Sequence, residues 1–94
     1  MENTHTHRYV DTARETLTNV SNLAFFPKDN GVVLQYTTQA GDKVEVELEQ
    51  GFMQTKAAIT YTIYDGPRSR TEQQNTTTAC LVTLLKDLNA EAAV

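Results

Sequence analysis

Apolar residues near the start of the chain recur at intervals of three and four positions. They fall at Val10, Ala13, Leu17, Val20 and Ala24. This spacing places their side chains on one stripe of an amphipathic helix. We therefore predict a helix from about Thr6 to Leu23. Pro27 disfavours helical geometry in the residue before it, so the helix should end before Phe26.

The segment that follows this helix carries two aromatic residues and then a turn signal. Phe25 and Phe26 are predicted to fold back beneath the sheet as core side chains. The run from Lys28 to Gly31 combines Asp, Asn and Gly, which are typical turn residues.

Three segments in the middle of the chain alternate between apolar and polar residues. They cover residues 32–38, 43–50 and 58–64. A period of two is typical of strands with one buried and one solvated face, so we predict an antiparallel meander. We choose the register that places apolar side chains opposite one another on the buried face. In this register Leu34 lies opposite Leu48, and Leu48 lies opposite Ile59.

The C-terminal segment returns to a helical period. The motif Ser69–Glu72 has the form of a capping box and predicts that a helix begins there. The apolar stripe of this helix comprises Thr78, Leu81, Leu85, Leu88 and Ala92.

These elements predict one α+β domain that spans residues 1–94. We expect a two-layer α-β-β-β-α arrangement, with a three-stranded antiparallel sheet and both helices packed on one face. Residues 1–5 are expected to form a flexible tail, and residues 90–94 to fray.

The amino-acid composition argues against several classes of protein. Twelve acidic side chains against eight basic ones give a formal net charge of -4, so direct nucleic-acid binding is not expected. The single cysteine cannot form a disulfide within the chain, which favours a reducing compartment. No apolar run approaches the length of a membrane span, and the first residues do not resemble a secretory signal, so we expect a cytoplasmic protein.

The clearest charged feature is a row of three glutamates, Glu45, Glu47 and Glu49, on the polar face of the second strand. One interpretation is a solvated outer face that maintains solubility. The other is an acidic patch that docks on the basic surface of a protein partner. Carboxylates on an open sheet face lack the burial that would separate their pKa values for acid–base catalysis.

Two further groups of residues are candidates for binding. Phe52 and Met53 occupy the tip of the second hairpin, where they either contact a partner or curl over the end of the core. Arg68 and Arg70 precede the predicted second helix and could hold an anion. The alternative, which we favour, is an ordinary surface loop.

The remaining reactive side chains predict no catalytic or metal site. His5 and His7 would supply only two ligands from the tail. Cys80 has no histidine nearby in the sequence and is expected to be a small buried residue. We therefore expect no cofactor, no metal and no enzyme activity.

Three functional hypotheses follow. The first is a small acidic inhibitor or accessory factor, of the kind found as phage or plasmid antagonists and immunity proteins, which acts by electrostatic and steric docking. The second is a homodimeric chaperone or structural module that pairs through a sheet edge, at residues 32–38 or 58–64. The third is a small-ligand binder at the Arg68/Arg70 loop.

Overall fold

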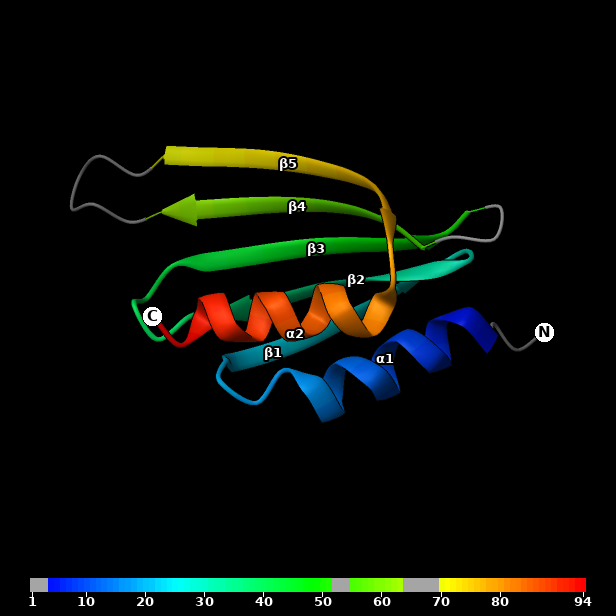
Figure 1. The fold of residues 1–94 in the computed structure, drawn as a ribbon, viewed down its shortest axis with the longest axis horizontal. Helices are drawn as coiled ribbons and strands as arrows, with labels where there is room; N and C mark the ends of the chain where they lie inside the picture. The colour runs from blue at the N-terminus through cyan, green and yellow to red at the C-terminus, as the bar shows by residue number, and fades with distance from the viewer. Residues whose placement is uncertain (1–3, 52–54, 64–69) are drawn as a thin grey trace.

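The computed structural model describes residues 4–51, 55–63 and 70–94 of the chain. Two helices flank five strands along this sequence (Figure 1). In chain order the elements are α1 (Thr4–Thr16), β1 (Ser21–Lys28), β2 (Gly31–Thr37), β3 (Lys43–Gln50), β4 (Thr55–Ile63), β5 (Arg70–Ala79) and α2 (Leu81–Ala92). The strands form one antiparallel sheet in the order β1-β2-β3-β4-β5, so the α+β class with an antiparallel sheet is confirmed.

The predicted number of three strands is wrong, because two segments assigned to helices and turns are strands. The helix ends at Thr16, before the run Thr18–Ser21, whose residues favour caps and strands over helix interiors. β1 then takes in Phe25, Phe26 and Pro27. Phe26 is 50% exposed, so its predicted role as a core side chain is also wrong.

β5 replaces the predicted start of the second helix. The capping-box motif at Ser69–Glu72 does not begin a helix, since Arg70 and Glu72 belong to β5. The β-branched run Thr76–Thr78 favours a strand. α2 begins at Leu81 instead, with Cys80 in extended geometry as its N-cap.

The central strands pair two residues away from the predicted register. Leu34 lies opposite Val46 rather than Leu48, and Val46 lies opposite Ile59. A shift of two residues keeps every side chain on its predicted face. In the β2–β3 loop, Thr38 donates its backbone N–H to Asp42 O at 2.8 Å, and Gly41 supplies the left-handed residue at φ 94°.

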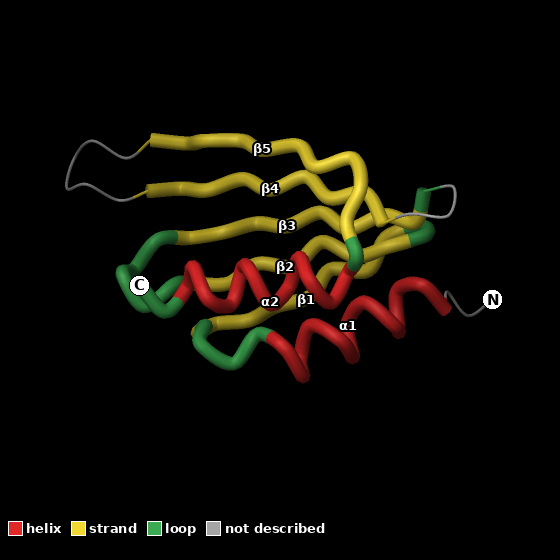
Figure 2. Tube along the Cα trace, in the orientation of Figure 1, coloured by secondary structure: helices red, strands yellow, loops and turns green. Residues whose placement is uncertain are grey.

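The two segments proposed as free sheet edges are interior strands. β2 is paired with β1 and β3, and β4 with β3 and β5, so neither β2 nor β4 offers an open edge. The edges of the sheet are β1 and β5 (Figure 2).

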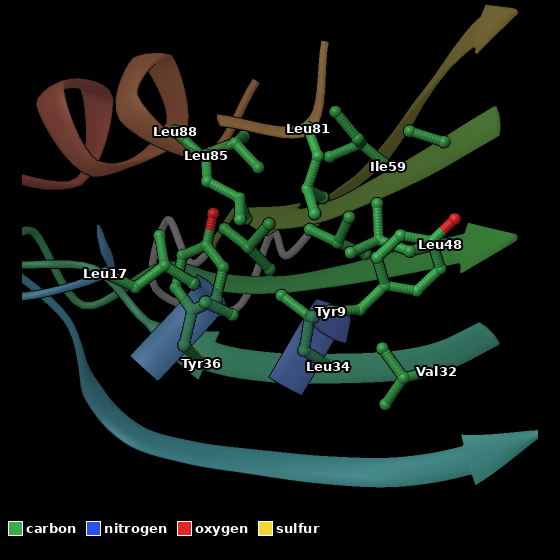
Figure 3. Packing of buried hydrophobic residues seen from close by; sticks show 14 of the residues in the cluster. Tyr9, Leu17, Val32, Leu34, Tyr36, Leu48, Ile59, Leu81, Leu85 and Leu88 are labelled. Carbon is green, nitrogen blue, oxygen red and sulfur yellow. The ribbon is translucent and has the colours of Figure 1, made fainter. Parts of the chain in front are cut away.

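Buried apolar side chains from both helices and from β2, β3 and β4 form one hydrophobic cluster (Figure 3). Its members on the strands are every second residue, as the alternation requires. They are Val32, Leu34, Tyr36, Val44, Val46, Leu48, Ala57 and Ile59. The helices add Tyr9, Ala13, Leu81, Leu85, Leu88 and Ala92, and Leu17 follows directly after α1. The predicted apolar stripe of the second helix is confirmed from Leu81 onward.

Polar contacts tie the helices to the loops around this cluster. Asn89 of α2 accepts the backbone N–H of Asn19 at 2.8 Å and donates to Thr18 Oγ1 at 3.2 Å. Gln39 in the β2–β3 loop donates its backbone N–H to Ala92 O at 2.9 Å. The C-terminal helix is therefore hydrogen-bonded to two separate loops.

We predict that the fold unfolds in alkali because of two tyrosines on the core side of the sheet. Burial, with the nearby Glu91 carboxylate, raises the pKa of Tyr61 to about 12. Burial also raises the pKa of Tyr36 above its usual value. The unfolded chain ionises near pH 10, so this stability is complete below pH 10 and is lost as the pH rises through about 12.

Tyrosinate absorbance and circular dichroism, followed together during an alkaline titration, measure this effect. Tyr36→Phe removes an ionisable hydroxyl and should move the alkaline unfolding midpoint to higher pH. An unchanged midpoint in that variant would show that Tyr36 ionisation does not drive the transition.

Candidate functional site

The face of the sheet opposite the hydrophobic cluster exposes the three glutamates of β3. Glu45, Glu47 and Glu49 are exposed, while their neighbours Val46 and Leu48 are buried. We call this surface the open face. It comprises the strand positions on the side of the sheet away from the hydrophobic cluster, including Glu45, Glu47 and Glu49 of β3.

Register places residues from neighbouring strands in rows across the open face. The row of Glu45 contains Ala24, Gln35, Thr60 and the β5 position Gln73. The row of Glu47 contains Phe26, Val33, Ala58 and the β5 position Asn75. The row of Glu49 contains Lys28, Gly31 and Lys56.

Basic side chains divide this face into regions of different charge. β3 and β4 contribute Lys43 and Lys56 near the glutamates, and β1 brings Lys28 there as well. The Lys28 ammonium contacts the Glu47 carboxylate and lies 4.0 Å from that of Glu49, and the hydrogen bond to Glu47 raises the pKa of Lys28. The end of the open face at Glu49 is therefore mixed in charge.

A half-open pocket of about 370 Å³ lies at the other end of the face, around Glu45. Its lining combines polar and apolar surface and comes from β1, β2, β3 and β4. The lining residues are Asn22, Gln35, Tyr36, Thr37, Lys43, Val44, Glu45, Thr60 and Thr62. Gln35 donates from Nε2 to Glu45 Oε1 at 3.3 Å, which orients the carboxylate within this ring of polar groups.

A β-bulge brings Asn22 to this pocket. The β1–β2 register shifts between Ser21 and Ala24, and Asn22 adopts a left-handed φ of 57°. Asparagine tolerates this conformation better than most residues, and bulges redirect the side chains that they carry. The sequence analysis missed Asn22, because a bulge leaves no periodic signal.

The row of Glu47 also carries three apolar side chains. The exposed ring of Phe26 lies in the same row as Val33 and Ala58, both partly buried. An exposed aromatic ring beside charged and amide side chains is typical of the centre of a protein interface. Phe26 was assigned to the core because a strand at residues 21–28 was not foreseen.

The other predicted site residues do not join this face among the described residues. Phe52, Met53 and Arg68 lie outside the described part of the chain. Arg70 is the first residue of β5, at its pairing with Ile63. The proposed anion site at a helix start is lost, since no helix begins there.

Cys80 is exposed, which contradicts the prediction of a buried cysteine. It lies at the junction of β5 and α2, where hydrogen bonds from Thr83 lower the pKa of the thiol. Within residues 4–51, 55–63 and 70–94, no group of three or more His, Cys, Asp or Glu side chains could hold a metal ion.

Comparison with known proteins found no matching family model, curated protein or solved structure. Among the described residues, neither helix has the length and apolar character needed to cross a membrane.

Proposed function

We propose that this chain is a small non-enzymatic protein-binding module, an inhibitor or accessory factor, that docks on its partner through the open face. The observation that carries this proposal is the grouping of a half-open pocket, an exposed phenylalanine and a mixed-charge row on one side of the sheet. An exposed aromatic ring beside polar and charged side chains is a composition typical of a protein interface.

The pocket favours a basic side chain of the partner as the group that it receives. The lining combines the Glu45 carboxylate and the Lys43 ammonium with the hydroxyls of Thr37, Thr60 and Thr62. The carboxylate and the hydroxyls can accept hydrogen bonds from an arginine or a lysine, and the ammonium can donate to a carbonyl oxygen of the partner. The volume of about 370 Å³ leaves space for one long side chain. Charge-assisted hydrogen bonds to Glu45 would fix the orientation of the partner.

The net charge of -4 supports the same partner chemistry at longer range. An acidic chain attracts a basic surface before contact, which raises the association rate at low salt. At the mixed-charge end, Lys28 and Lys56 would disfavour a partner that is basic throughout, so they restrict how the partner can be oriented.

Charge reversal at Glu45 tests the proposal. Glu45→Lys should weaken capture of the partner at least tenfold, because truncating or reversing one member of a buried charge pair costs several kcal/mol of binding (~2–5 kcal/mol). The measurement uses immobilised protein to recover the partner from a lysate, followed by titration with the purified partner.

The matched control is Glu15→Lys, which makes the same charge change at an exposed position of α1. Equal affinity of the control and the unmodified protein, with loss in Glu45→Lys, would support docking at the open face. If both variants lost affinity equally, only net charge would matter. The pocket would then have no role.

A further inference from the structure

The two edges of the sheet differ in their ability to accept another strand. β1 carries three features that oppose pairing along its outer side. Pro27 lacks a backbone N–H, the register is interrupted between Ser21 and Ala24, and Asn22 has a left-handed φ. Proline and bulges on edge strands prevent edge-to-edge association.

β5 is less protected, because its pairing with β4 is interrupted only near its C-terminal end, between the Thr55–Ala79 and Ala57–Thr76 pairs. It runs for ten residues without proline, glycine or lysine. Its pairing with β4 continues without a shift from Thr76 opposite Ala57 to Arg70 opposite Ile63. In Figure 1 no other described element lies beyond β5, so its outer row of backbone N–H and C=O groups faces away from the sheet.

We propose that β5 pairs antiparallel with β5 of a second copy of this chain across a two-fold axis, so that two five-stranded sheets become one ten-stranded sheet. A two-fold contact uses the same strand twice, and each backbone hydrogen bond is therefore repeated by symmetry. This inference is independent of the function proposed for the open face.

We expect a second copy of the chain to pair with β5 because the β1 edge of the sheet is blocked. If both edges accepted strands, β5 of one copy could pair with β1 of the next and the sheet would grow without limit. Because β1 is blocked, β5 can pair only with another β5 and assembly stops at two copies.

The sequence of β5 suits pairing with itself. Seven of its ten residues are Thr, Gln or Asn. Such residues form favourable cross-strand pairs with their own kind. The charged positions Arg70 and Glu72 lie near one end, so antiparallel pairing about the middle of the strand places no like charges opposite each other.

Pairing through β5 would also join the two open faces. The β5 positions Gln73 and Asn75 continue the rows of Glu45 and Glu47. In the dimer these rows run across the two-fold axis, and the two faces lie on the same side of one sheet. A partner with two equivalent surfaces could then be bound at both, with a gain in avidity.

The test is the mass of the full chain in solution, measured by sedimentation velocity from 1 to 200 µM. Asn75→Lys and Asn75→Glu each place like charges near the two-fold axis and should weaken dimerisation at least thirtyfold. An equimolar mixture of the two variants should recover a dimer of mixed composition, since opposite charges then meet. Ala24→Lys, a charge added at the blocked edge, should leave the dimer unchanged.

Hydrogen exchange provides a second measurement that does not depend on any substitution. Alternate amides of β5 should exchange more slowly at 200 µM than at 1 µM, while those of β1 should not change. A monomer across the concentration range would overturn the inference, as would dissociation caused by Ala24→Lys or a mixture of the Lys and Glu variants that stays monomeric.

Discussion

Replacing Gly31 with alanine should destabilise the fold by about 3 kcal/mol or more, which is the upper end for overpacking in a protein interior. A Cβ at this position would collide with the carbonyl oxygen of Leu48 and would lie 2.9 Å from its carbonyl carbon and 3.0 Å from Glu49 Cα. These are backbone atoms of β3, so no side-chain rotation can relieve the contact.

The substitution should disturb more than one pair of elements, because Gly31 lies where β2 meets both β3 and α1. It begins β2 directly after the β1–β2 turn, and its carbonyl accepts the Thr6 hydroxyl of α1 at 2.6 Å. Moving β2 away from β3 would therefore disturb the hairpin and the contact with the helix together. Urea unfolding, followed by circular dichroism, measures the loss as a lower transition midpoint.

Gly41→Ala is the matched control. This glycine has φ 94° in the β2–β3 loop, and no atom lies within 4 Å of the position that a Cβ would take. Its substitution should cost only the strain of a left-handed alanine, about 1 kcal/mol. Equal midpoints for the two variants would show that close strand approach at Gly31 does not limit stability.

The central strands were predictable because their environment differs on the two faces. The alternation from Lys43 to Gln50 assigns each side chain to the core or to solvent, and the structure agrees residue by residue. The register within that alternation was missed by two residues. Shifting one strand by two residues still places apolar side chains opposite apolar side chains. The geometry of the connecting loop therefore decides between the two registers.

The outer strands were not predictable by the same method. β5 has polar residues on both faces, so it carries no apolar period, and the start of β1 is irregular where the bulge at Asn22 occurs. The consequence for the site is direct. Lys28, Phe26 and Asn22 all belong to β1, so a prediction without that strand lacks the ion pair, the exposed ring and the bulge asparagine of the open face.

The second large effect should come from Leu85→Ala, which we expect to lower the free energy of unfolding by about 3 kcal/mol, within the range for a fully buried leucine. The side chain of Leu85 is 0% exposed and lies within the hydrophobic cluster (Figure 3). Removing it leaves a cavity between α2 and the sheet that the strands, fixed by their hydrogen bonds, cannot fill. Urea unfolding again gives the free energy.

Val82→Ala on the same helix separates packing from helix propensity. Val82 is 42% exposed, so its truncation removes little buried surface, and alanine favours the helix slightly. We expect a change within about 0.5 kcal/mol, as for most surface substitutions. The polar contacts of Asn89 remain in both variants, so any difference between them reports the packing of the apolar stripe alone. Equal losses would mean that α2 is held by those polar contacts and not by its buried leucines.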